Sequence, residues 1–168
     1  MKSDTIAAIA TALSDAGIGI IRISGPEAIA VANRVVVNKK KEHTLKNWQT
    51  HTIHYGFVEE NGTILDEVMV SVMKAPRSYT TEDTVEINCH GGVLLTKRVL
   101  EAVLHAGARM AEPGEFTKRA FLSGRIDLSE AEAVMDLIQA KNQFSMQASI
   151  KQLRGSVAEK VKLSLIHI

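Results

Sequence analysis

The chain has 168 residues, 45% hydrophobic and 23% charged, which is typical of a globular protein with one domain, or one domain and part of another. A formal net charge of +1 excludes a global electrostatic attraction to nucleic acid or to an anionic membrane. Cys89 is the only cysteine, which excludes an internal disulfide and favours a reducing compartment. The sequence has no secretory leader pattern and no apolar run near ~20 residues, so we expect a cytoplasmic protein with no membrane association.

The first two thirds of the chain predict a mixture of strands and helices. The segment Ser24-Gly25-Pro26-Glu27 predicts the start of a helix, and Asn61-Gly62 predicts a hairpin turn. A second helix is expected after His90-Gly91-Gly92, and Gly107 is expected to end it. Runs rich in β-branched residues predict strands at residues 5–10, 19–23, 51–58, 64–73 and 85–89.

The longest basic run is Lys39-Lys40-Lys41, in the loop expected after the first helix. Arg34 and Lys46 are nearby in the sequence, but no aromatic residue is interleaved with the lysines. Because single-stranded nucleic acids are bound by basic and aromatic residues together, we interpret this run as a solvated loop.

After Gly114 the pattern becomes entirely helical. Pro113 and Gly114 are expected to begin a helix, and Gly124 is expected to end it in a left-handed conformation. Ser129 and Glu132 have the spacing of a capping box for the next helix.

Apolar residues spaced three or four apart then predict one further helix from Met146 to Leu165, with Gly155 inside it. We therefore predict an α+β fold, with a mixed-sheet domain at residues 1–117 and the first helices of a truncated helical domain at residues 118–168.

Several common catalytic patterns are absent from the sequence. It contains no G-x-x-x-x-G-K-[ST] phosphate loop, no H-E-x-x-H, no paired C-x-x-C and no G-x-S-x-G. Residues 17–22 resemble a dinucleotide fingerprint, but Arg22 stands where the third glycine belongs, so we reject that interpretation. The six histidines are scattered, and no metal site is predicted.

Three charged residues lie on or beside ordered elements. Arg22 and Glu86 each interrupt an apolar strand, and Arg125 lies on the short connection between two predicted helices. A charge in such a strand often faces solvent or lies at a sheet edge. Alternatively, Glu86 accepts hydrogen bonds in a polar pocket where arginines bind an anion. Spacing alone leaves both interpretations open.

Longer motifs carry a family resemblance over residues 1–162. Residues 4–11 and 19–25, residues 78–87 with Cys89-His90-Gly91-Gly92, and residues 113–133 occur in the order and with the gaps found in one family. In these segments the chain resembles the start of the bacterial tRNA-modification GTPases of the MnmE (TrmE) family.

The resemblance implies an N-terminal domain that binds tetrahydrofolate, is similar to the folate domain of aminomethyltransferases, and forms a homodimer. A helical domain follows, interrupted by a GTPase domain that uses GTP, Mg²⁺ and K⁺ in the full-length protein. With a flavin-dependent partner (MnmG, or GidA), such proteins place an aminomethyl or carboxymethylaminomethyl group on the wobble uridine of tRNA. The one-carbon donor is 5-formyltetrahydrofolate or 5,10-methylenetetrahydrofolate.

The family positions that contact the folate match Arg22, Glu86 and Arg125, and no catalytic residue is carried over. A pterin ring presents adjacent N–H donors that the Glu86 carboxylate can accept, whereas the arginines suit the anionic glutamyl tail or the one-carbon carbonyl. Relatives often have lysine at the position of Arg125.

The chain also departs from the family pattern. The GTPase domain and the C-terminal segment with the family's cysteine are absent, so we expect no GTP hydrolysis by this chain, and Cys89 is not that cysteine. Residues 11–17 replace a segment rich in proline and glycine, and residues 163–168 differ from the expected charged helix. Two alternatives remain: a stand-alone aminomethyltransferase-like folate protein, and a dimerisation scaffold that has lost its ligand.

Overall fold

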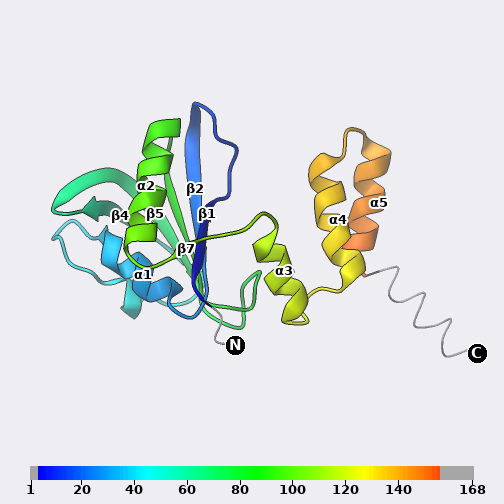
Figure 1. Ribbon diagram of the computed structural model, residues 1–168, viewed down its shortest axis with the longest axis horizontal. Helices are drawn as coiled ribbons and strands as arrows, with labels where there is room; N and C mark the ends of the chain where they lie inside the picture. The colour runs from blue at the N-terminus through cyan, green and yellow to red at the C-terminus, as the bar shows by residue number, and fades with distance from the viewer. Residues whose placement is uncertain (1–3, 156–168) are drawn as a thin grey trace, which may run out of the picture. The chain divides into compact units, whose positions relative to one another are not determined.

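The structure, a computed structural model, describes residues 4–155 and has the α+β composition expected from the sequence (Figure 1). The chain forms two compact units, Met1–Pro113 and Gly114–Ile168. A division after residue 117, as expected from the composition, falls inside helix α3 (Glu115–Leu122) of the second unit.

Among the described residues, the first unit is built on a seven-stranded sheet with strand order β3-β4-β5-β6-β2-β1-β7. Neighbouring strands are antiparallel except β1 and β7, which run parallel, so the sheet is mixed as expected. The strands are β1 (Ile6–Ile9), β2 (Ala16–Ser24), β3 (Val36–Val37), β4 (Thr52–Glu60), β5 (Thr63–Met73), β6 (Thr84–Gly91) and β7 (Arg109–Met110).

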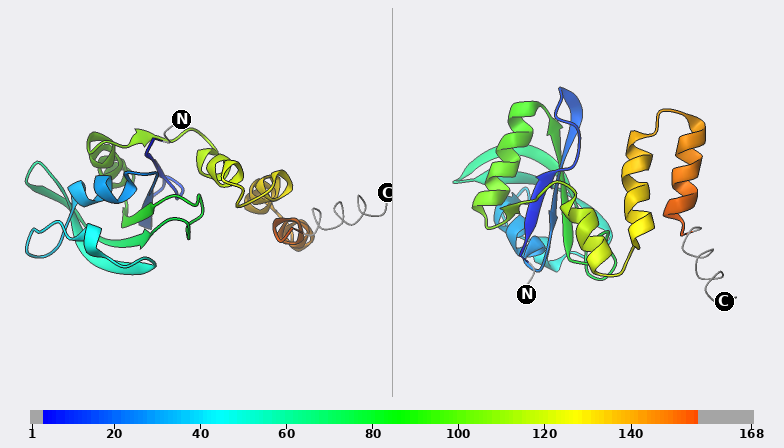
Figure 2. Two further views of the ribbon diagram at one scale, coloured as in Figure 1. Left: turned by 90° about the horizontal axis from the view of Figure 1, so that it is seen from below. Right: turned by 45° about the vertical axis from the view of Figure 1, so that its right-hand side comes forward.

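Helices α1 (Ala28–Val35) and α2 (Val93–His105) cover one face of this sheet (Figures 1 and 2). Because side chains alternate along a strand, every second residue of the central strands contributes to the core beneath these helices. Ile21 and Ile23 of β2 and Val85 and Ile87 of β6 are all fully buried there. The intervening residues belong to the opposite face of the sheet, which no helix of the first unit covers.

The hairpin predicted at Asn61-Gly62 is confirmed, because it joins β4 to β5 with φ values of 51° and 80°. Two consecutive residues with positive φ give the turn whose twist matches that of the paired strands. The sequence missed β3 and β7, which are each two residues long, and the short 3₁₀ helix η1 (Leu45–Asn47).

The described part of the second unit contains α3, α4 (Leu128–Gln139) and α5 (Gln143–Leu153). Gly114 (φ 74°) precedes α3 and Gly124 (φ 77°) follows it, as predicted. The predicted capping box was wrong by two residues. Asp127 accepts from the backbone N–H of Glu130 at 2.8 Å, and the Glu130 side chain accepts from the Asp127 N–H at 2.8 Å. An aspartate caps as well as a serine does, and it stands one residue before the helix begins.

The helix predicted from Met146 to Leu165 is also corrected. Helix α5 begins at Gln143, capped by the side chain of Asn142, and ends at Leu153. Gly155 follows with φ of 77°, so this glycine lies beyond the end of a helix instead of serving close packing inside one. The rest of that prediction, and the segment 163–168, lie outside the described residues.

Candidate functional site

Arg22 and Glu86 form an ion pair on the face of the sheet opposite α1 and α2. The two residues are register partners on β2 and β6, and Arg22 Nε donates to Glu86 Oε1 at 2.8 Å. Their side chains are 32% and 22% exposed, so neither is fully in solvent and neither is fully buried. Both strands are internal to the sheet. The interpretation of these charges as sheet-edge residues is therefore excluded, and the pair lies where a ligand on this face can reach it.

A buried polar atom without a hydrogen-bond partner lies two residues further along β6. The side-chain oxygen of Asn88 is buried and unsatisfied, and alternation along the strand puts Asn88 on the same face as Glu86. An unsatisfied buried carbonyl oxygen costs about 1–3 kcal/mol. Glu86 and Asn88 together give this part of the sheet two acceptor groups suited to a ligand rich in N–H donors.

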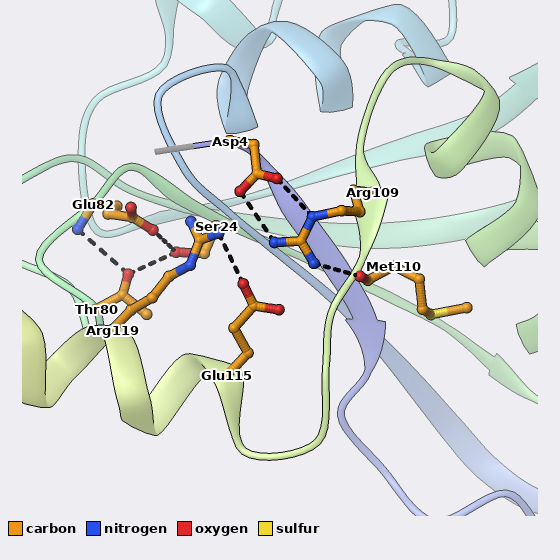
Figure 3. Close-up of polar contacts among 8 residues, drawn as sticks. All are labelled: Asp4, Ser24, Thr80, Glu82, Arg109, Met110, Glu115 and Arg119. Carbon is orange, nitrogen blue, oxygen red and sulfur yellow. Dashed lines mark hydrogen bonds and ion pairs between the residues drawn. The ribbon is translucent and has the colours of Figure 1, made fainter. Parts of the chain in front are cut away.

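The polar loop before β6 is fastened to the end of β2 by Ser24 (Figure 3). The Ser24 hydroxyl lies 2.6 Å from Thr80 Oγ1 and donates to Glu82 Oε2 at 2.8 Å. Gly25 N donates to the carbonyl of Asp83 at 3.0 Å. Ser24 is fully buried, so these contacts fix the loop beside the strand that carries Arg22. This role of Ser24 is not predictable from its own sequence context, although the polar run at residues 78–84 indicates a loop.

The C-terminal end of β6 is held by Asp66 of β5. Asp66 Oδ2 accepts from the backbone N–H of His90 at 2.8 Å, and Asp66 Oδ1 lies 2.8 Å from the His90 ring nitrogen Nδ1. The hydrogen bond and the negative charge of Asp66 raise the pKa of His90. Burial raises the pKa of the Cys89 thiol, whose Sγ donates to the carbonyl of Gly19 at 3.3 Å, so this cysteine is not an activated nucleophile.

Arg125 belongs to the second unit, on the exposed connection between α3 and α4, where its backbone N–H donates to the carbonyl of Ala120 at 3.0 Å. Of the three predicted site residues, Arg22 and Glu86 are in contact within the first unit. That Arg125 lies close to this pair stays a prediction. Within α3, Arg119 Nη2 and Glu115 Oε1 form a largely buried ion pair at 3.1 Å (Figure 3).

A separate hollow of about 570 Å³ lies at the N-terminal end of α2. It does not include Arg22 or Glu86, and the guanidinium of its Arg98 is bound by Glu60 and Glu101. Its lining is mostly apolar and consists of Asp15, Leu65, Gly92, Val93, Leu94, Leu95 and Arg98.

Within residues 4–155, no three His, Cys, Asp or Glu side chains are grouped so that they could hold a metal ion. None of the helices in the described part of the chain combines the length and the apolar character needed to cross a bilayer.

Comparison with known proteins assigns these elements to a family. Residues 5–125, which include β1 to β7, α3 and both members of the Arg22–Glu86 pair, match the family described as "GTP-binding protein TrmE N-terminus". The chain belongs to the TrmE family. It corresponds to the N-terminal part of tRNA modification GTPases named MnmE.

Curated relatives extend this similarity to nearly the whole chain. The tRNA modification GTPase MnmE of Lachnoclostridium phytofermentans is 61% identical over 162 residues, which cover 96% of this chain and 35% of the relative. The MnmE of Streptococcus thermophilus is 57% identical over 154 residues, or 92% of this chain and 33% of the relative. The MnmE of Listeria welshimeri is 54% identical over 162 residues, or 96% and 35%. The chain thus spans about a third of the length of these relatives.

Proposed function

We propose that this chain binds 5-formyltetrahydrofolate or 5,10-methylenetetrahydrofolate through Arg22 and Glu86, with Arg125 as a third contact. The observation that carries the proposal is the Arg22–Glu86 pair beside the unsatisfied oxygen of Asn88. A polar pair that is only partly exposed, next to a buried acceptor without a protein partner, is typical of a ligand-binding site.

The chemistry of folate fits these groups. The pterin ring carries an amino group and an adjacent ring N–H, and a carboxylate with a neighbouring amide oxygen can accept from both, as Glu86 and Asn88 offer. Arg22 is hydrogen-bonded to Glu86 and therefore suits the one-carbon carbonyl beside the pterin ring, whereas the carboxylates of the folate tail suit the guanidinium group of Arg125. The bound folate supplies a one-carbon unit, and the residues of this chain bind and orient it.

In the full-length protein, this folate site serves the modification of the tRNA wobble uridine, with an aminomethyl or carboxymethylaminomethyl group as the product. The first unit forms a homodimer with a second copy of itself. GTP hydrolysis, the flavin-dependent partner and tRNA act with parts of the relatives that lie beyond the segment matched by this chain. The setting of this activity is the cytoplasm.

The proposal is tested by titrating the 168-residue chain with 5-formyltetrahydrofolate and measuring the heat of binding by calorimetry. We expect micromolar affinity, and we expect Glu86→Gln or Arg22→Ala to remove about 1.5–3 kcal/mol of binding free energy, which is roughly 10- to 150-fold. Glu101→Gln, an exposed glutamate on α2, is the matched control and should leave the affinity unchanged. Circular dichroism on each variant separates lost binding from lost folding.

Two results would contradict the proposal. Unchanged affinity in both Glu86→Gln and Arg22→Ala would show that the pair is not the folate site. No binding by the wild-type chain at millimolar folate would favour the interpretation as a scaffold without a ligand.

A further inference from the structure

The three consecutive lysines lie on an ordered loop, which the sequence pattern alone did not reveal. Asn38 organises this loop, because its Oδ1 accepts from the backbone N–H groups of Lys40 at 2.8 Å and Glu42 at 3.0 Å. The Asn38 backbone N–H donates to the carbonyl of Glu42 at 3.0 Å and closes the loop. Lys41 has a φ of 61°, a conformation that a lysine rarely adopts outside a well-determined turn. The backbone of the loop is therefore held by its own hydrogen bonds, with the three lysines exposed on it.

The fold supplies the aromatic residues that the lysine run lacks in the sequence. Strand β3 pairs with β4 through Val37 and Phe57, so the loop after β3 begins beside the aromatic part of β4. Lys39 Nζ lies 5.3 Å from the centre of the Tyr55 ring, within the range of a cation–π contact. Tyr55 and Phe57 contact each other edge to face, with ring centres 5.4 Å apart.

These side chains share a face with two exposed apolar residues. Tyr55 is 40% exposed, and Met69, its register partner on β5, is 43% exposed. Ile53, two residues before Tyr55 on the same strand, is 62% exposed. We name Lys39, Lys40, Lys41, Tyr55 and Phe57 the lysine–tyrosine patch. The patch combines a partly exposed aromatic ring, which has Lys39 over one face, with the two lysines that follow Lys39 in the same loop.

Two nearby carboxylates, Glu42 and Glu67, hydrogen-bond to groups other than the three lysines. The Glu42 carboxylate accepts from the Asn38 side chain at 2.9 Å and is part of the loop. Glu67 accepts from the Tyr55 hydroxyl, and this contact raises the pKa of Tyr55. The hydroxyl of the ring is thus directed toward Glu67, and Lys39 lies over the ring.

We propose that the lysine–tyrosine patch binds single-stranded RNA, with a base stacked on Tyr55 and the adjacent phosphates bound by Lys39, Lys40 and Lys41. Unpaired bases stack on aromatic side chains, and lysines beside them neutralise the phosphate backbone. An unpaired loop of a structured RNA fits this patch better than a duplex, whose bases are already stacked. The proposal rests on the proposed tRNA-modifying function and adds a contact surface for its nucleic acid substrate.

Fluorescence anisotropy with a labelled RNA hairpin that has the sequence of a tRNA anticodon arm tests this proposal. The 168-residue chain is titrated into the hairpin at several salt concentrations. We expect the triple variant Lys39→Ala, Lys40→Ala, Lys41→Ala to bind at least about tenfold more weakly, with a salt slope lower by up to about 2. We expect Tyr55→Leu to lose about fivefold or more in affinity while the salt slope stays unchanged.

The matched control removes the same total charge elsewhere. The triple variant Lys97→Ala, Lys141→Ala, Lys151→Ala replaces three exposed lysines of other elements and should bind the hairpin like the wild type. Equal losses in the two triple variants would show non-specific attraction and overturn the proposal. No binding by the wild type at low salt would do the same.

Sedimentation of Tyr55→Leu distinguishes another occupant of this face. A change in oligomeric state together with unchanged RNA affinity would assign the face to a second copy of the chain and overturn the proposal. Folate titration of the same samples keeps the two proposals apart. Normal folate affinity together with no RNA binding would contradict the RNA-binding proposal and leave the folate-binding proposal intact.

Discussion

Arg22 and Glu86, 64 residues apart in the sequence, stand directly opposite each other on β2 and β6 and are joined by a hydrogen bond of 2.8 Å. Cross-strand pairs of opposite charge stabilise a sheet modestly, by roughly 0.2–1 kcal/mol. Two charges on internal strands next to the unsatisfied Asn88 oxygen therefore support the proposed binding site.

A double-mutant cycle on Arg22→Ala and Glu86→Ala should give a coupling energy of about 1 kcal/mol in urea unfolding. The pair is partly shielded from water, whereas Arg98 and Glu101 are each about half exposed and should couple by less than roughly 0.5 kcal/mol. A second double-mutant cycle on Arg98→Ala and Glu101→Ala is the control. Equal coupling energies in the two cycles would mean that partial shielding from water does not strengthen the Arg22–Glu86 contact.

Asp127→Ala should destabilise the second unit by about 1 kcal/mol, because it removes the N-cap of α4. Ser129→Ala should be neutral or slightly stabilising, since the Ser129 hydroxyl is buried without a partner. Thermal unfolding followed by helical circular dichroism measures both. The opposite order of effects would restore Ser129 as the cap.

Ser24→Ala should cost about 1–3 kcal/mol of unfolding free energy, because it leaves the buried Thr80 hydroxyl and the Glu82 carboxylate without the serine. The loop at residues 78–83 should then be cleaved faster by protease at low temperature. Ser14→Ala, in an exposed loop, is the control. If the loop in Ser24→Ala is cleaved no faster than in the wild type, the serine does not hold the loop in place.

His90 should titrate above its ordinary value of about 6.5, and Asp66→Asn should return its pKa toward that value. Since the folded-state pKa is raised, the contribution of this pair to stability is fully present below the unfolded pKa and is lost as pH rises through the folded pKa. NMR titration of the His90 ring protons gives the pKa directly. Glu101→Gln, remote from the pair, should not change it, and an unchanged pKa in Asp66→Asn would exclude Asp66 as the cause.

Much of this fold could be predicted from local signals. The turn at Asn61-Gly62 and the glycines at 114 and 124 each require positive φ, and a residue type that tolerates it makes the position recognisable. The cap of α4 was misplaced because Asp127 and Ser129 are both good capping residues and both have a glutamate three residues later. Only the contacts of the folded helix distinguish them.

Features that depend on strand pairing could not be predicted in this way. The opposition of Arg22 and Glu86 follows from the β2–β6 register, and the proximity of Lys39 to Tyr55 follows from the β3–β4 pairing. The absence of aromatic residues around Lys39 in the sequence led to its interpretation as a plain solvated loop, because a linear pattern contains no information about a neighbouring strand. The sequence therefore identifies the charged residues of the site, whereas the residues that they contact become known only from the strand pairing.

Strand β7 lies parallel to β1, and Arg109 binds Asp4 through two contacts of 2.6 and 3.1 Å (Figure 3). The polypeptide thus enters and leaves the first unit at one edge of its sheet. A short added linker between these neighbouring ends should allow a circular permutant opened at the exposed Asn61-Gly62 turn to reach the same fold. A continuous chain at that turn would then not be needed for folding, whereas the pairing of β1 with β7 would still be required to complete the sheet.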